Sequence, residues 1–115
     1  MSPRSWRIRA QDILQAISEI EIFTDHASIE EFLKDVKSVR AATACLTVIG
    51  EAANHIPQSI KDRYPEVPWE QIRGMRTRIT HEYFSVDDAV IWKTAKERLP
   101  AFKVQIQNIL DSLVD

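Results

Sequence analysis

The sequence predicts an all-α protein, an up-and-down bundle of four main helices with short helices between them, and three observations indicate this class. The 115 residues include only two glycines, on which tight β-hairpins depend for positive φ angles. Apolar residues recur three and four positions apart along most of the chain, which is the period of an amphipathic helix. The five prolines fall at the edges of these apolar stretches, where helices tolerate them.

The first half of the chain predicts three helices. Apolar residues between Trp6 and Phe23 follow helical spacing over about five turns. The sequence Ser28-Ile29-Glu30-Glu31 is typical of a capping box, so a short helix is expected from there through Leu33. Apolar and small residues from Val36 to Ala53 then predict a long helix that a neighbouring helix can approach closely.

The second half predicts shorter helices separated by prolines. One short helix is expected around Ile60, between Pro57 and Pro68. Helical spacing resumes from Trp69 to Ile79. A second cap-like sequence, residues 85–88, precedes a helix that extends to Leu99, and Pro100 either kinks that helix or begins the last one.

Composition narrows the class of protein further. The length fits a single domain spanning residues 1–115, and 44% hydrophobic with 28% charged residues is typical of a globular protein. A net charge of −2 gives no overall attraction to nucleic acid or membrane. Because no apolar run reaches 18 residues and no cleavable leader is visible, we expect no membrane contact and a cytoplasmic location. Cys45 has no cysteine to pair with, and Gly50 and Gly74 are too few for a glycine-rich phosphate loop.

Residues 73–83 are the most unusual part of the chain. They contain three arginines, His81 and Tyr83 against a single acidic residue. On an unbroken helix, Arg76 and His81 would point about 140° apart. Because the preceding helix must end before the cap at Ser85, we expect the turn between the two helices to bring these side chains toward one site.

Arginine and histidine together suit phosphodiester chemistry. The Arg76 guanidinium can hold a phosphate and stabilise charge that develops on its oxygens. The His81 imidazole can take a proton from a ribose 2′-hydroxyl or return one to the leaving oxygen. This chemistry requires no metal and no cofactor. One histidine cannot easily act as acid and base together, so we infer that two chains each supply one.

The same residues resemble a known family. Arg76, followed after four residues by His81 and then by Tyr83, is similar to the R-x4-H-x-Y pattern of HEPN-superfamily ribonucleases. The surrounding sequence resembles the HepT-like toxins in four places: residues 49–53, 68–76, 81–84 and 91–92. The resemblance extends over nearly the whole chain.

The resemblance carries specific implications. HepT-like proteins are helical homodimers in which the paired motifs form an RNA-cleaving groove at the dimer interface. Their antitoxin is a separate minimal nucleotidyltransferase that attaches AMP to the motif tyrosine. By this resemblance, Arg76 and His81 carry catalysis and Tyr83 is the AMPylation site. AMP on Tyr83 would bring phosphate charge and bulk into a groove shaped for RNA.

Several residues near the motif have two interpretations. Thr77 stands where the family commonly has asparagine, so it keeps a hydroxyl group but lacks the amide donor. Arg73 and Arg78 either follow the RNA phosphates or form a solvated face. Glu51 either orients an arginine near the groove or is exposed on the far side of its helix. Tyr83 itself is either the modified residue or a packed ring with its phenol at the surface.

Other features concern metals, charge and a rival function. His26 and His55 lack metal-ligand spacing with each other and with His81, so no metal site is expected. The first ten residues are basic and residues 19–35 acidic, and the basic N-terminus could share an RNA-binding face with residues 73–78.

The rival function is a non-catalytic helical subunit that binds a nucleotidyltransferase or a nucleotide through the groove that the resemblance assigns to RNA.

Overall fold

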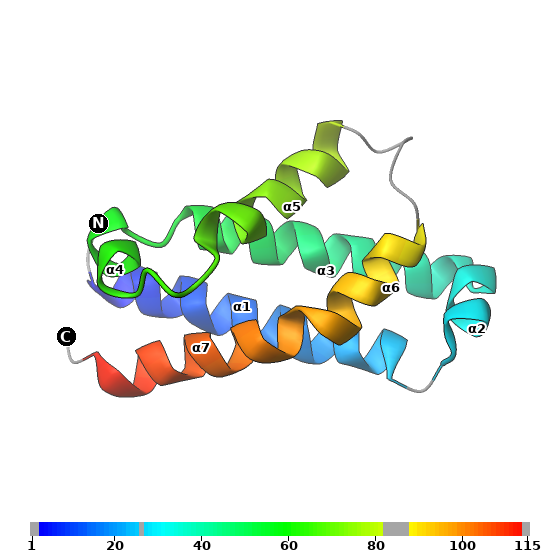
Figure 1. Cartoon of the computed structure of the whole chain (residues 1–115), viewed down its shortest axis with the longest axis horizontal. Coiled ribbons are helices and arrows are strands. Elements are labelled where there is room, and N and C mark those ends of the chain that lie inside the picture. Colours follow the sequence, from blue (N-terminus) through cyan, green and yellow to red (C-terminus); the bar gives the residue numbers. More distant parts are fainter. Residues whose placement is uncertain (1–2, 26, 82–87, 114–115) are drawn as a thin grey trace.

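The computed structural model describes residues 3–25, 27–81 and 88–113, and every regular element in them is a helix (Figure 1). This confirms the all-α fold class. The helices are α1 (Pro3–Thr24), α2 (Ile29–Lys34), α3 (Val36–Asn54), α4 (Gln58–Arg63), α5 (Trp69–His81), α6 (Asp88–Glu97) and α7 (Leu99–Ser112). None of them is long and apolar enough to cross a membrane.

The two longest helices, α1 and α3, form the centre of the bundle. They run antiparallel, with α5 packed against α3, α7 packed against α1, and α6 in contact with both central helices (Figure 1). The contacts between the central helices are made by the apolar positions that the sequence predicted. Ile13 and Ile17 of α1 and Ile49 of α3 are completely buried.

Side-chain caps separate the short helix α2 from its neighbours. The Ser28 hydroxyl accepts from the Glu31 backbone N–H at 3.1 Å, and the Glu31 carboxylate accepts from the Ser28 N–H at 3.1 Å, which confirms the expected capping box. Asp35 caps α3 by accepting from the backbone N–H of Ser38 at 3.3 Å and from its hydroxyl at 2.8 Å. These hydrogen bonds lower the pKa of both the Glu31 and Asp35 carboxyl groups.

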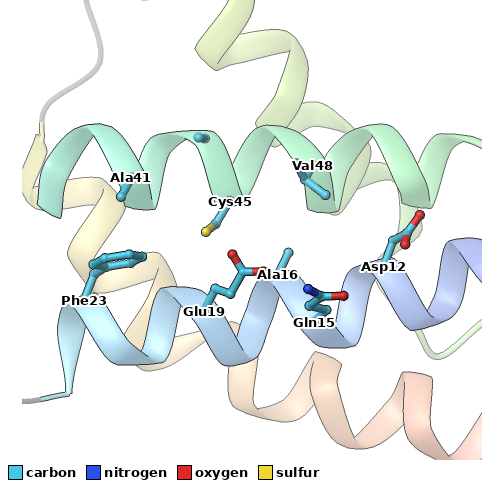
Figure 2. Close-up of a pocket in the computed structure, with 9 residues that line it drawn as sticks. Asp12, Gln15, Ala16, Glu19, Phe23, Ala41, Cys45 and Val48 are labelled. Atoms are coloured by element: carbon cyan, nitrogen blue, oxygen red, sulfur yellow. The ribbon is translucent and has the colours of Figure 1, made fainter. Parts of the chain in front are cut away.

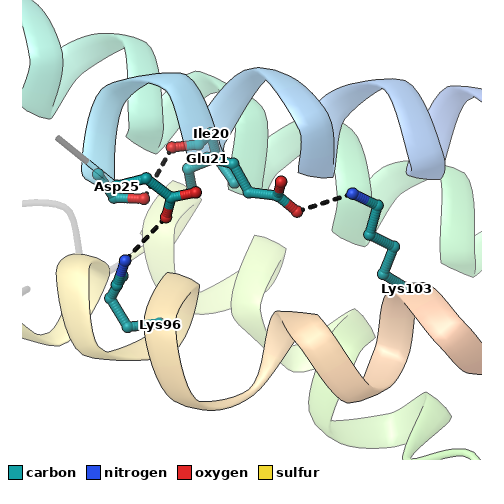
Figure 3. A network of polar contacts seen from close by, with 6 residues as sticks. Ile20, Glu21, Asp25, Lys96 and Lys103 are labelled. Atoms are coloured by element: carbon teal, nitrogen blue, oxygen red, sulfur yellow. Dashed lines mark hydrogen bonds and ion pairs between the residues drawn. The ribbon is translucent and has the colours of Figure 1, made fainter.

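Two ion pairs join the end of α1 to the C-terminal helices (Figure 3). Lys96 of α6 lies 2.8 Å from the Asp25 carboxylate, and Lys103 of α7 lies 3.0 Å from the Glu21 carboxylate. The acidic stretch of the sequence is therefore partly neutralised by lysines that lie 71 and 82 residues further along the chain. Such partly exposed pairs each stabilise a fold by about 0.2–1 kcal/mol.

The last helix begins with a proline in its first turn, and an arginine of α1 binds its C-terminal end. Pro100 lies in the first turn of α7, so it begins this helix and does not kink α6. At the other end, the Arg7 guanidinium donates to the backbone carbonyls of Leu110 and Leu113. Arg7 therefore satisfies carbonyls that the helix itself leaves unpaired. The sequence had suggested RNA contacts for this basic segment and gave no sign of this structural role.

Candidate functional site

The candidate residues lie along α5, whose first turns are anchored in the core. The Trp69 ring is buried edge-on against the ring of Phe102 in α7, with their centroids 6.2 Å apart. Its indole N–H donates to the Tyr64 carbonyl at 3.1 Å, and Ile72, one turn further, is also buried. Pro68 suits the position before this helix because the first N–H groups of a helix have no intrahelical acceptor. These contacts fix the position from which the rest of α5 extends.

The structure places Arg76 and His81 in one continuous helix. The predicted turn does not separate them, because α5 ends only at His81. The reason is local, since no proline or glycine lies between the two residues. The described backbone therefore contains no turn between the two residues, and their meeting at one site stays a prediction. Positions 76 and 81 are about 140° apart around the helix axis and about 7.5 Å apart along it.

The remaining motif residues are described less completely. The backbone of residues 76–81 is helical, which places Thr77 and Arg78 on α5 as well. The side chains of residues 76–81 lie outside the part of the structure that is described. Tyr83 and the cap-like residues 85–87 lie wholly outside it.

Two arginines, one from α5 and one from the start of α7, contact polar side chains in the first half of α5. Arg73 is exposed and lies 2.7 Å from the Glu70 carboxylate, one turn earlier. Arg98, at the start of α7, donates to the side-chain oxygen of Gln71 at 3.2 Å. The contact with Gln71 brings a cation from outside the motif next to α5. The sequence gave no signal for Arg98, because 27 residues separate it from Gln71.

Gly74 lies within α5, between these two contacts and Arg76. Apart from the backbone of α5 itself, a Cβ atom built at this position would meet no heavy atom of the described residues within 4 Å. Glycine in the interior of a helix costs about 1 kcal/mol relative to alanine. Neither packing nor a positive φ angle requires glycine here.

Glu51 and His55 form a pair at the end of α3. The His55 ring nitrogen Nε2 lies 3.1 Å from Glu51 Oε1, and both side chains are partly exposed. Glu51 is therefore neither fully buried nor fully exposed. Because α3 ends on the side of the bundle where α5 begins, His55 lies near the start of α5, whereas His81 is its last residue (Figure 1).

A groove lies between α1 and α3 (Figure 2). It encloses about 440 Å³ over small and apolar side chains, and it carries the carboxylates of Asp12 and Glu19. Cys45 lies in its floor, where burial and the charge of Glu19 raise the pKa of the thiol. Two carboxylates beside an apolar floor repel phosphate, so this groove does not suit an RNA backbone.

A second hollow of about 500 Å³ lies where α4 meets the start of α5. The Lys61 ammonium lies within it, 6.0 Å from the centre of the Trp69 ring, and burial lowers the pKa of this lysine. Asp62 and Glu70 also line the hollow, so its charge is mixed. Within the described residues, no three histidine, cysteine or acidic side chains are grouped so that they could hold a metal ion.

An all-helical chain whose Arg-x4-His pattern occupies the end of one helix, with tyrosine two residues later, has the features of a HEPN-type protein. Comparisons with known proteins agree. Residues 13–109 match the family model described as "Ribonuclease HepT-like", and this chain belongs to the HepT-like ribonuclease family.

Individual relatives cover nearly the same length. A protein of Thermococcus cleftensis named "Probable ribonuclease HepT" is 41% identical over 106 residues, which are 92% of this chain and 96% of that protein. A protein of Methanocaldococcus jannaschii named "Putative RNase MJ1216" is 35% identical over 113 residues, 98% of this chain and 93% of its own length. No solved structure gives a significant match.

Proposed function

We propose that this protein is a metal-independent RNA endonuclease and the toxin of a toxin–antitoxin system. The observation that carries the proposal is the Arg76-x4-His81 pattern at the end of α5, within a chain of the HepT-like ribonuclease family. The names of the relatives support ribonuclease activity in particular.

The proposed reaction is a transesterification within the RNA strand. One histidine removes the proton from a ribose 2′-hydroxyl, and the 2′-oxygen then forms a bond to the adjacent phosphorus. The bond from phosphorus to the 5′-oxygen breaks, and a second, protonated histidine gives its proton to that oxygen. The Arg76 guanidinium binds the phosphate and stabilises the additional negative charge of the transition state.

The second histidine comes, in this proposal, from a second copy of the chain. Positions 76 and 81 are about 140° apart around the axis of α5, which favours a site that a second α5 completes. His55 lies near the opposite end of α5 and is already paired with Glu51. A homodimer that brings two α5 helices together would supply both an acid and a base.

Cleavage of RNA by the purified protein tests the catalytic proposal. Arg76→Ala and His81→Ala are each expected to lower the rate at least about 100-fold. Arg40→Ala, which removes an exposed arginine from α3, is the matched control and should cleave normally. Wild-type activity should survive a chelator, and expression of the wild type but not of the two site variants should arrest growth.

A different result would favour the rival function. If the wild type cleaves no RNA, while wild type and both site variants bind a nucleotidyltransferase equally well, the chain is a non-catalytic partner subunit. If cleavage persists in His81→Ala, the assignment of the histidine is wrong.

We propose further that the antitoxin is a minimal nucleotidyltransferase that neutralises the protein by AMPylation of Tyr83. The added phosphate charge and bulk next to His81 would exclude RNA phosphate. Mass spectrometry after incubation with the cognate transferase and ATP should show added AMP on the wild type and none on Tyr83→Phe. An adduct that persists in Tyr83→Phe would refute this residue as the acceptor.

A further inference from the structure

Gly74 occupies a position that this chain does not itself require to be glycine. It lies in the interior of α5, two turns from the last residue of the helix, and no described glycine has a positive φ angle. A Cβ atom there would meet no described atom within 4 Å beyond the backbone of α5 itself. Because glycine is a poor helix former, alanine at this position would stabilise the isolated chain. The described part of the chain therefore contains no requirement for glycine at position 74.

The surroundings of Gly74 are polar and include two described cations. Residues three and four positions apart on a helix lie beside each other on its surface, and the positions before Gly74 at this spacing hold Glu70 and Gln71. The Glu70 charge is balanced by Arg73 at 2.7 Å, and Gln71 holds the Arg98 guanidinium at 3.2 Å. Arginine and glutamine side chains are common partners of the phosphates and sugars of nucleic-acid backbones.

Position 81, which holds the proposed catalytic histidine, lies on the same side of α5 as Gly74. Position 81 is seven residues beyond Gly74, which is two helical turns and about 10.5 Å along the axis. Trp69 and Ile72, which anchor the helix, are buried in the core, whereas Gly74 adjoins open space. An extended strand that passes Gly74 on this side continues along α5 toward residue 81.

We propose that the sugar–phosphate backbone of the RNA substrate lies directly against α5 at Gly74, and that Gly74 is a positioning residue for cleavage. The missing side chain lets the strand approach the helix closely enough for Arg73 and Arg98 to reach its phosphates. A strand held there enters the site at His81 in a fixed register. The inference rests on the proposed RNA-cleaving function.

A series of side chains of increasing size at position 74 tests this role. We would compare wild type with Gly74→Ala and Gly74→Leu, and with Asn108→Ala as a control that raises helix propensity at an exposed position of α7. KM and kcat for an RNA substrate would be measured, together with melting temperature. Affinity for the same RNA would be measured in a His81→Ala background, which does not cleave.

We expect the Gly74 variants to have a higher KM for RNA and a lower RNA affinity than wild type, and Gly74→Ala to be more stable. Gly74→Ala and Asn108→Ala should both raise the melting temperature by a few degrees. KM should rise about tenfold in Gly74→Ala and further in Gly74→Leu, with a smaller change in kcat, and RNA affinity should fall in parallel. Asn108→Ala should leave KM, kcat and affinity unchanged.

Three results would overturn the inference. Unchanged KM and RNA affinity in both Gly74 variants would show that nothing lies against the helix at this point. An equal loss in Gly74→Ala and Gly74→Leu would show that backbone freedom matters rather than space. Dissociation of the homodimer by both variants, seen by size-exclusion chromatography with light scattering, would place a second copy there.

Failure of the inference is distinguishable from failure of the proposed function. If the wild type cleaves RNA and the Gly74 variants have the same KM as the wild type, only the inference is contradicted. Wild type that binds RNA without cleaving it contradicts the catalytic function, and the affinity series still decides the role of Gly74. Wild type that neither binds nor cleaves RNA contradicts both.

Discussion

The α1–α3 pair and helix α5 perform different tasks in the molecule. The two central helices bury isoleucines on their facing sides, and the groove between them carries the carboxylates of Asp12 and Glu19. In α5, the described buried residues, Trp69 and Ile72, lie in the first two turns, and three arginines follow between positions 73 and 78. The central pair thus provides the buried core of the fold, whereas α5 carries the arginines of the proposed site.

The net charge of the chain does not reveal how differently its segments are charged. The total of −2 averages residues 19–35, which hold six acidic residues against one lysine, with α5, which holds three arginines against one glutamate. An RNA strand responds to the local potential and not to the sum. In the proposed function, RNA would therefore approach α5 and not the groove that carries the carboxylates of Asp12 and Glu19.

The largest expected effect on stability lies in the central pair. Ile49→Ala removes a completely buried side chain from α3 and should lower the free energy of unfolding by about 2–5 kcal/mol. Val48→Ala is a matched control, because the neighbouring side chain is 46% exposed, and it should cost less than about 1 kcal/mol. Urea denaturation measures both. Equal losses would contradict the position of the core between α1 and α3.

A smaller, pH-dependent effect is expected at the start of α3. The pKa of Asp35 is lowered in the folded state by its hydrogen bonds to Ser38, so its contribution to stability is present above the pKa of the unfolded chain. This contribution is lost as pH falls through the folded pKa. Asp35→Asn keeps a capping oxygen that does not titrate. Thermal melts from pH 6 to pH 3 should show wild type losing more stability than Asp35→Asn, and parallel curves would contradict the cap.

The smallest effect concerns the groove thiol. Burial, and secondarily the charge of Glu19, raises the pKa of Cys45, so little thiolate forms at neutral pH. Alkylation by iodoacetamide should be slow, and Glu19→Gln should accelerate it about two- to threefold. Glu30→Gln on α2 is the control and should not change the rate. If Glu19→Gln also leaves the rate unchanged, the carboxylate does not act on the thiol.

Local sequence signals predicted most of the fold. The spacing of apolar residues located α1 and α3 to within a few residues, and Ser28 with Glu31 located the start of α2. Pro100 left two possibilities, because proline is compatible both with a kinked helix and with the first turn of a new one. In the structure it lies in the first turn of α7. The family was also recognisable from Arg76, His81 and their neighbours.

Contacts between distant segments could not be predicted in the same way. Arg7 was expected to form part of a basic surface, yet it donates to the end of α7, more than one hundred residues away. The pairing of Glu51 with His55 spans one helical turn, but two partly exposed residues at this spacing give no strong signal in a sequence. The continuity of α5 through His81 was missed because the expected cap at Ser85 suggested an earlier turn.

The central claim is that a single site is shared by two chains, and subunit mixing tests it most directly. Wild type and His81→Ala would be unfolded together, refolded in varying proportions at constant total protein, and assayed for RNA cleavage. If each site requires a histidine from both chains, activity falls as the square of the wild-type fraction, to about one quarter at equal proportions. A linear fall, to about one half at equal proportions, would show that each chain cleaves alone and would contradict the claim.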